Sequence, residues 1–376
     1  MTDHVFIVEN AKTISHTFIR ADIRHAEASG PVTVIDISEV YAALLGGDRS
    51  LADAVLGVLE LVVTSPVTLM RCLVGGRARS NAKALLVYGA LRREWAKRER
   101  CSFTVHFAAK AALVGTLLAR PGRSYLRLVV HASDLYGLPR SMHFVLTEAT
   151  AIETVTWFAK GFVFGRLGDA AIGKVTMQRN RVVPGHASDA RRLESSSVGR
   201  RQLLTVARLA TQKDLPFAIR VFAELVHGLG QDWCYRIAGE GPERAQLEAI
   251  ARDLGVEDRV DFLGAVPNDE VRELCEVSAA FLLPCAESTV DDADGLPVVF
   301  QEALLAGCPV FCRSAFGVAE LVVDGFNGRS FPVDATPVEW ARAITSDLAT
   351  LNPVSIRALA RCQNERSVAD RSIGGG

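Results

Sequence analysis

Several features that would place this chain in other protein classes are weak or missing. Its 376 residues carry a formal net charge of −1, so there is no electrostatic case for nucleic-acid binding. None of its eight cysteines forms a Cys-x-x-Cys pair, and Cys308 and Cys312 have no nearby partner for zinc. We therefore expect reduced, buried thiols, as in cytoplasmic proteins. No Gly-x-Gly-x-x-Gly follows the first strand, which disfavours a nicotinamide-dependent dehydrogenase.

Long apolar runs are also missing. The longest apolar tract, residues 54–70, is interrupted by Glu60 and Pro66, and it fits a buried helix and a turn better than a membrane span. The N-terminus carries Asp3 and Glu9 around a short strand-like segment, which does not resemble a signal peptide. We expect a soluble, cytoplasmic protein.

The chain does contain an alternation of strand-like and helix-like segments. Its length suggests two domains, and 49% apolar residues suffice for two cores. In the second half, the expected strands are 203–207, 235–238, 260–263, 280–283 and 310–311, and the expected helices are 215–226, 243–254, 269–276 and 340–348. In the first half, the expected strands are 5–8, 32–36, 103–106, 126–131 and 162–164. Repeated strand–helix units predict an α/β fold with parallel, doubly wound sheets.

A polar stretch predicts the domain boundary. We expect an N-terminal domain over 1–185, a linker over 186–200, a C-terminal domain over 201–350 and a tail over 351–376. In the first half we also expect a helix over 82–100, which ends in the basic cluster Lys97–Arg100. A solvated helix face is the simpler interpretation of this cluster, and a patch for anionic lipid is the alternative.

The most informative segment is the loop and helix from Asp294 to Glu302, which has one carboxylate at each end. Pro297 suits the first helical position, and Gly295 lets backbone approach a ligand closely. Free N–H groups and the helix dipole favour phosphate at that helix start. Glu302 is within reach of a hydroxyl pair on the same ligand. The segment predicts a site for a sugar attached to a nucleoside diphosphate.

Two other strand-to-helix loops carry residue types that suit the binding of a diphosphate or a nucleotide. Arg208 and Lys213 flank the loop after strand 203–207, and two cations there can neutralise a diphosphate; two exposed surface charges are the alternative. Gly239 and Gly241 follow the next strand, where glycine permits a tight turn and close approach of a ring or phosphate. Both loops lie at the carboxyl ends of strands, where ligands of doubly wound sheets bind.

Two histidines in the first half also end predicted strands. His106 and His131 would each be structural if considered alone, but both point to the same edge of one sheet. Near the N-terminus, Ser15 and Thr17 lie in the segment Ile14–Ile19.

Taken in order, these motifs resemble the retaining family 4 (group 1) glycosyltransferases, whose GT-B fold has two Rossmann-like, doubly wound domains facing each other across a cleft. The segments 303–310, 317–320 and 324–328 extend the resemblance. Asp294 stands where the family usually has glutamate, and Asp214 stands where it has glycine.

The resemblance implies a role for each motif. It assigns hydroxyls of the transferred sugar to Asp294, the ribose diol to Glu302, the diphosphate to Arg208, Lys213 and the backbone of Gly295, Leu296 and Pro297, and the nucleotide to Gly239 and Gly241. The histidine segments are similar to those of a branch acting on exopolysaccharide or lipopolysaccharide precursors. There the second histidine, His131, lies beside the transferred sugar, while His106, Ser15 and Thr17 fall on the acceptor side. His16 replaces a glutamate of that branch.

We therefore expect a retaining glycosyltransferase of the hexosyltransferase type. It would move a sugar from a nucleoside diphosphate sugar to a glycan or lipid-linked glycan in cell-surface polysaccharide or glycoconjugate biosynthesis. No enzyme nucleophile is evident, so front-face transfer is expected. The cations can replace a metal, so we expect no metal and no cofactor. Peripheral contact at the inner face of the membrane is compatible with this function. The alternatives are a non-catalytic GT-B-like subunit that binds sugar nucleotides, or an epimerase or phosphorylase of similar fold.

Overall fold

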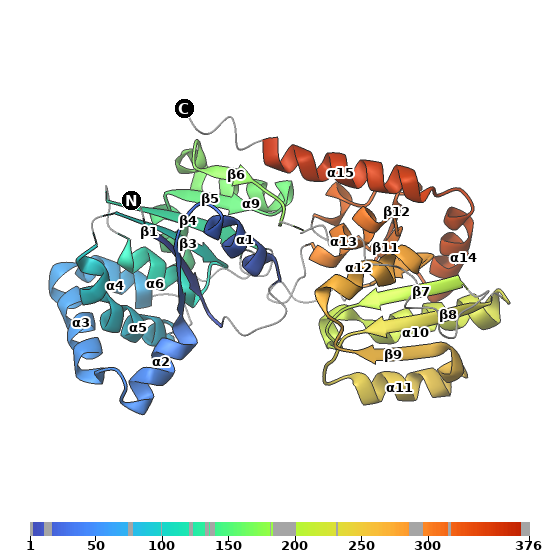
Figure 1. The fold of residues 1–376 in the computed structure, drawn as a ribbon, viewed down its shortest axis with the longest axis horizontal. Coiled ribbons are helices and arrows are strands. Elements are labelled where there is room, and N and C mark those ends of the chain that lie inside the picture. Colours follow the sequence, from blue (N-terminus) through green and yellow to red (C-terminus); the bar gives the residue numbers. More distant parts are fainter. Residues whose placement is uncertain are drawn as a thin grey trace. The chain divides into compact units, whose positions relative to one another are not determined.

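Two parallel sheets organise the protein. The computed structural model describes residues 3–10, 17–73, 78–98, 100–119, 123–131, 135, 140–180, 182, 201–230, 232–285, 296–314 and 317–369. Tertiary contacts divide the chain into two compact units; the first ends at Arg181 and the second runs from Val182 to Ala369. Each unit has a six-stranded parallel sheet with helices packed on it (Figure 1), which confirms the expected doubly wound α/β architecture. The expected linker, 186–200, lies outside the described residues.

The first unit has the strand order β2-β1-β3-β4-β5-β6. Its elements are β1 (Asp3–Val8), α1 (Thr17–Glu27), β2 (Val32–Asp36), α2 (Ile37–Gly46), α3 (Leu51–Thr64), α4 (Pro66–Leu73), α5 (Ala78–Ala96), β3 (Cys101–His106), α6 (Lys110–Leu118), β4 (Ser124–Val130), α8 (Arg140–Glu148), β5 (Ala151–Thr154), α9 (Trp157–Leu167) and β6 (Val175–Met177).

The second unit has the strand order β12-β11-β10-β7-β8-β9. Its elements are β7 (Arg201–Val206), α10 (Leu215–Ala223), β8 (Trp233–Ala238), α11 (Arg244–Asp253), β9 (Val260–Gly264), α12 (Asn268–Val277), β10 (Ala280–Leu282), α13 (Val298–Ala306), β11 (Val310–Arg313), β12 (Gly328–Phe331), α14 (Pro337–Leu348) and α15 (Pro353–Ala369). A single turn of 3-10 helix, η3 (Thr211–Lys213), precedes α10.

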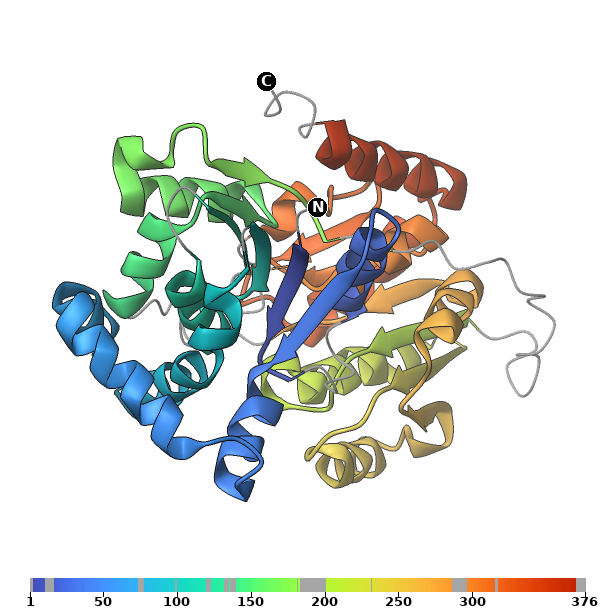
Figure 2. The same ribbon diagram turned by 60° about the vertical axis from the view of Figure 1, so that its left-hand side comes forward.

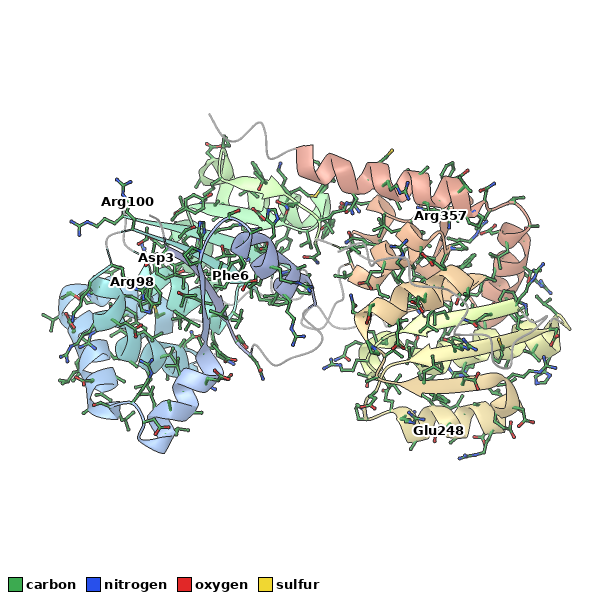
Figure 3. All side chains as sticks on the ribbon, in the orientation of Figure 1. Asp3, Phe6, Arg98, Arg100, Glu248 and Arg357 are labelled. Atoms are coloured by element: carbon green, nitrogen blue, oxygen red, sulfur yellow. The ribbon has the colours of Figure 1, made fainter. Side chains whose placement is uncertain are left out.

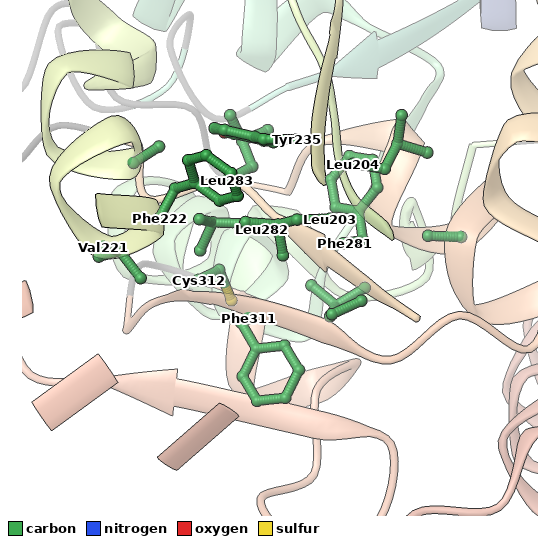
Figure 4. Packing of buried hydrophobic residues seen from close by; sticks show 14 of the residues in the cluster. Leu203, Leu204, Val221, Phe222, Tyr235, Phe281, Leu282, Leu283, Phe311 and Cys312 are labelled. Carbon is green, nitrogen blue, oxygen red and sulfur yellow. The ribbon is translucent and has the colours of Figure 1, made fainter. Parts of the chain in front are cut away.

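The central strands of the second unit are apolar on both faces. Leu203, Leu204 and Phe281 are completely buried, and they pack with Phe222 and Phe311 in one cluster (Figure 4). Parallel strands covered by helices on both faces require such continuous apolar sequence. The carboxyl ends of these strands are thereby fixed on a rigid core.

The two faces of the first sheet differ in polarity. The strand register pairs Thr104 with Arg127, and His106 lies two residues further along β3, so these three side chains share one face. Val105, on the opposite face, is completely buried in the apolar core. Helix α1 lies over the polar face, where its Asp22 contacts both His106 and Arg127.

Some predicted elements are wrong or incomplete. Residues 162–164 form no strand, because they lie inside α9, whose start is capped by Thr156 accepting a hydrogen bond from the N–H of Ala159 at 3.0 Å. The short strands β5, β6 and β12 were not expected. Residues 353–369 of the expected tail form α15, a helix of the second unit that packs against α13.

The tract 54–70 is helical, but its expected burial is wrong on one side. Helix α3 lies on the outside of the first unit and packs on α5 (Figures 1 and 2). We call its exposed apolar face, with that of α4, the α3–α4 surface, which consists of Leu51, Val55, Leu56, Leu59, Val62, Val63, Val67 and Met70. Within the described ranges, no single helix is long and apolar enough to cross a bilayer. The segments Leu51–Thr64 and Pro66–Cys72 meet that test only together, and they are bent by 117°.

The basic cluster at the end of α5 has a partly structural role. Arg98 donates a hydrogen bond to Asp3 at 2.7 Å, at the start of β1 (Figure 3). Its guanidinium also lies 4.2 Å from the centre of the Trp95 ring. This arginine therefore ties the end of α5 to the first strand.

Candidate functional site

The structure brings together the two histidines of the first unit. His106 ends β3 and His131 directly follows β4, and Nδ1 of His106 lies 3.4 Å from Nε2 of His131. Both side chains are buried, with 5% and 7% of their surface exposed. Because parallel strands end at one edge of a sheet, the prediction that both histidines point to the same edge is confirmed.

A buried chain of charges continues from His106. Its Nε2 lies 3.2 Å from Oδ2 of Asp22, and that same carboxylate oxygen accepts a hydrogen bond from Arg127 at 2.7 Å. The guanidinium of Arg127 also donates two hydrogen bonds to Glu153, at 2.7 and 2.6 Å. One arginine thus links two carboxylates on a covered face of the sheet, a geometry that suits buried ion pairs.

The electrostatics of this chain define its protonation. Burial alone would raise the pKa of Asp22, but its hydrogen bond with His106 and the charge of Arg127 hold that pKa well below its usual range. Burial lowers the pKa of His106 and outweighs the opposing effect of Asp22. At neutral pH the carboxylate is therefore ionised and the imidazole is neutral.

Aromatic rings surround His131. The ring centre of Phe107 lies 4.4 Å from that of His131, and the ring of Phe18 on α1 lies 4.8 Å away. Phe107 adopts a φ of 67°, in the left-handed region. Thr17 is the first residue of α1, whereas Ser15, His16 and Asp134 lie outside the described residues. Whether Ser15 and Thr17 face an acceptor therefore stays a prediction.

In the second unit, Arg208 and Lys213 flank the loop between β7 and α10, as expected. Arg208 is exposed, whereas Lys213 is partly buried at the end of η3. Burial lowers the pKa of Lys213, and the positive charge of Arg208 lowers it further, although the neighbouring Cys285 acts in the opposite direction. Two like charges in one loop, one of them desolvated, attract an anion more strongly than two solvated surface charges do.

Asp214, which replaces the usual glycine of the resembled family, takes the conformation that glycine would. Its φ and ψ are both 48°, in the left-handed region. Its carboxylate accepts a hydrogen bond from Arg313 at 2.6 Å, and the same nitrogen donates to the carbonyl of Cys285 at 3.1 Å. The N–H of Cys285 in turn donates to the carbonyl of Lys213 at 3.2 Å. Arg313 thus ties the cationic loop to the end of β10.

Close packing between two loops of the second unit requires glycine at positions 239 and 241. A Cβ atom on Gly239 would collide with the carbonyl of Ala207, and one on Gly241 with the carbonyl of Leu209. Both carbonyls belong to the loop that carries Arg208. The glycines therefore let two strand-end loops pack backbone to backbone, a reason that the sequence alone did not reveal.

The segment from Asp294 to Glu302 is only partly described. Asp294 and Gly295 lie outside the described residues, so the contacts of Asp294 stay a prediction. Pro297 is the residue before the first helical residue of α13, not within the helix, and Leu296 is buried. Glu302 is partly buried in α13; burial raises its pKa, and a hydrogen bond with Asn268 opposes that shift.

Sequence reasoning missed four residues of these two arrangements: Asp22, Arg127, Glu153 and Arg313. One signal was available, because Arg127 interrupts the apolar strand Ser124–Val130 and shares its face of the sheet with His131. Asp22 and Arg313 approach from distant parts of the chain, so no local pattern marks them.

Comparisons with known proteins agree with the resemblance. Residues 189–350 match the model of the family described as glycosyl transferases group 1. The chain is 28% identical over 257 residues to a GDP-mannose-dependent alpha-(1-6)-phosphatidylinositol monomannoside mannosyltransferase of Mycolicibacterium smegmatis, covering 65% of this chain and 66% of that protein. It is 30% identical over 171 residues to the amylovoran biosynthesis glycosyltransferase AmsK of Erwinia amylovora, covering 44% and 40%. The chain thus spans less than two thirds of these relatives.

Solved structures share the fold over the whole chain. The crystal structure of Anabaena Alr3699/HepE in complex with UDP-glucose superposes with a TM-score of 0.66 at 15% identity, covering 99% of this chain and 100% of that one. The lipopolysaccharide outer core galactosyltransferase WaaB, in its apo form, gives a TM-score of 0.63 at 15% identity, covering 98% and 100%. The two Rossmann-like units therefore have the GT-B fold.

Proposed function

We propose that this chain, which has the GT-B fold and resembles the group 1 glycosyltransferases, transfers a sugar from a nucleoside diphosphate sugar to a hydroxyl acceptor. The observation that carries the proposal is the loop of Arg208 and Lys213 at the carboxyl end of β7. It places one exposed and one desolvated cation together, and the end of β10 is bonded to it. The likeness of residues 189–350 to glycosyl transferases group 1 supports the same reading.

The leaving diphosphate explains this arrangement. As the bond to the sugar breaks, negative charge grows on the phosphate oxygens, and fixed cations stabilise that charge without reorganising. Arg208 and Lys213 would supply them, together with backbone N–H groups before α13. Glu302 would accept hydrogen bonds from the ribose diol, and Asp294 from hydroxyls of the transferred sugar.

We propose that transfer retains the anomeric configuration by front-face attack, in which the acceptor hydroxyl approaches the side that the diphosphate leaves. The resemblance supports this mechanism. The anomeric configuration of the first product, read by NMR during turnover, tests it. An inverted product would contradict it.

We also propose that transfer needs no divalent metal, because Arg208 and Lys213 would neutralise the charge of the leaving group. The chain contains one Asp-x-Asp triplet, Asp292 to Asp294, and this triplet lies outside the described residues. Because carboxylate pairs of this kind can bind a divalent metal, the proposal rests on the two cations and not on a lack of carboxylates. Full turnover in EDTA is expected. Activity abolished by EDTA and restored by magnesium or manganese would contradict the proposal.

The acceptor is proposed to be a glycan or lipid-linked glycan of the cell surface. The named function of the amylovoran relative and the histidine segments support this class. Transfer of a radiolabelled sugar to a panel of lipid-linked and free oligosaccharides would test it. Transfer only to small non-carbohydrate alcohols would contradict it.

We propose that the protein contacts a lipid surface peripherally through the α3–α4 surface. Eight apolar side chains lie there with no charged residue among them, because the acids of α3 turn towards α5. Asp53 pairs with Arg93 and Glu60 pairs with Arg92, each at 2.8 Å. An amphipathic helix that presents such a face inserts it at the boundary of headgroups and acyl chains.

Flotation with vesicles of mixed anionic and zwitterionic lipid tests this contact. The double variant Val63→Asp, Val67→Asp should release the protein from vesicles. The control is Val354→Asp, which alters a similarly exposed valine on α15, where 66% of the side chain is accessible. Unchanged flotation of the double variant would contradict the proposal, as would a dimer in solution that the same variant abolishes.

Thermal-shift screening of nucleoside diphosphates and their sugars tests the central proposal. A ligand that binds only the folded protein raises its melting temperature, by an amount that depends on its concentration relative to Kd. We expect at least one nucleoside diphosphate to do so, and its sugar conjugate to be consumed when acceptor is added. Binding without transfer or hydrolysis would instead indicate a non-catalytic subunit.

A further inference from the structure

A buried chain of side chains runs from Asp22 through His106 to His131 at the carboxyl edge of the first sheet. We infer that Asp22 and His106 are positioning residues, which hold the ring of His131 in one orientation and fix its proton on Nε2. His106, expected on the acceptor side, thus acts on its fellow histidine. The catalytic consequence rests on the proposed function, whereas the tautomer itself does not.

Hydrogen-bond chemistry fixes the direction of the chain. Arg127 can only donate hydrogen bonds, so the Asp22 oxygen that it contacts at 2.7 Å is an acceptor. That same oxygen lies 3.2 Å from Nε2 of His106. An ionised carboxylate has no proton to donate, so Nε2 of His106 must carry one.

Burial keeps His106 neutral at neutral pH, and this decides which nitrogen lies on each side of the contact between the two rings. A neutral imidazole carries one proton, so Nδ1 of His106 has a lone pair. The only proton that can lie on the 3.4 Å line between the two rings is therefore that of Nε2 of His131. In the neutral state of His131, its Nδ1 is then an acceptor, which suits a hydroxyl of the transferred sugar.

Neighbouring contacts hold the members of this chain in place. Glu153 anchors Arg127 through two hydrogen bonds from the far side, so the guanidinium cannot turn away from Asp22. Phe18 and Phe107 pack on the ring of His131. A fixed ring with a fixed tautomer loses little entropy when the substrate arrives.

One substitution should release His131 from the chain. His106→Phe keeps a buried ring of similar size but has no nitrogen that accepts a hydrogen bond. Asp22 keeps Arg127 as its partner, whereas Nε2 of His131 loses its acceptor. The proton of a neutral His131 is then no longer fixed on Nε2, and both tautomers become populated.

Long-range ¹H–¹⁵N NMR of the ring nitrogens reads this directly. The signals of His131 are identified by their loss in His131→Gln. We expect a protonated Nε2 of His131 in the native protein and a mixture of both tautomers in His106→Phe. The control is Glu153→Gln, which leaves Asp22 and His106 in place and should leave the tautomer unchanged. The native tautomer persisting in His106→Phe would show that the chain does not fix it. An unprotonated Nε2 in the native protein overturns the inference without any variant.

Turnover provides the second readout. With a donor found by thermal shift, His106→Phe should lower kcat at least about tenfold, with unchanged affinity for the nucleoside diphosphate. A tautomer that is released without any loss of kcat refutes the positioning role. If the tautomer is released but no sugar nucleotide binds the native protein, the proposed function fails while the direction of the chain stands.

Discussion

The carboxyl edges of the two sheets use charge in opposite ways. At the first edge, the charges form a closed series: Arg127 pairs with both Glu153 and Asp22, and the series ends on the imidazoles of His106 and His131. At the second edge, Arg208 is exposed and Lys213 is a desolvated cation beside it. A closed series of ion pairs fixes the orientation of its side chains, whereas two cations in one loop attract an anion. The first edge is thus suited to aim a side chain, and the second to hold a diphosphate.

The largest effect is expected from removing the desolvated cation of the second edge. Lys213→Met keeps most of the length of the side chain and removes the charge that we propose stabilises the leaving group. Turnover should fall by about 10²–10³, the usual result of deleting one fixed charge-stabilising donor. Arg220→Met, on the exposed face of α10, is the control and should retain full activity. Normal kcat in Lys213→Met would remove the functional difference between the edges.

The next largest effect concerns Glu302. Glu302→Gln should weaken nucleoside diphosphate binding by about 1.5–3 kcal/mol, because hydrogen bonds to a carboxylate are stronger than those to an amide. Calorimetric titration measures this change. Stability at neutral pH should not fall, since a buried carboxylate with a raised pKa disfavours folding while it is ionised. Equal affinity of variant and native protein would place the ribose elsewhere.

The raised pKa of Glu302 also predicts a pH dependence of native binding. In the proposed role the ionised form accepts hydrogen bonds from the diol, and burial raises the pKa and so favours the protonated form. As the pH falls, affinity should therefore begin to drop at a higher pH than an ordinary glutamate would cause. Glu302→Gln should lack this component. A native affinity that stays constant until the pH reaches the usual pKa range of glutamate would contradict the proposed role of Glu302.

A smaller effect is expected at the first edge. Removing the imidazole of His131 should lower kcat at least about tenfold, or roughly 1.4 kcal/mol of barrier, with unchanged affinity for the nucleoside diphosphate. His131→Ala serves this test less well, because the buried ring packs against Phe107 and truncation would leave a cavity. His131→Gln preserves most of the volume. A variant that melts early but keeps its specific activity would make His131 structural.

The two edges also differ in how far sequence predicted them. Motifs at the second edge are local: Arg208 and Lys213 lie in one loop, and Pro297 and Glu302 lie near one helix start, so residue spacing alone could nominate these residues. The first edge is assembled from α1, β3, β4 and β5, and only its histidines end strands. The strand residues 162–164 were assigned wrongly because apolar aromatic runs suit a buried helix equally well. Long-range pairs such as Asp22 with Arg127 have no local signature.

The smallest effect tests whether the second edge also depends on internal charge pairing. Asp214→Gly relieves the left-handed φ of 48°, a gain of about 1 kcal/mol. It also removes the acceptor of Arg313, whose side chain is 11% exposed. Removing one partner of a buried pair costs about 3–5 kcal/mol, and the Asp214 side chain, at 26% exposed, reduces that figure.

The loss should therefore outweigh the gain, and chemical denaturation should show a net destabilisation of about 1–2 kcal/mol. Asp214→Asn is the matched variant, since asparagine tolerates the left-handed region and keeps an acceptor oxygen for Arg313. It should lose less than Asp214→Gly. A more stable glycine variant would show that the ion pair contributes little, because backbone strain would then dominate the loop. The second edge would in that case hold its cations by backbone conformation alone, in contrast to the first.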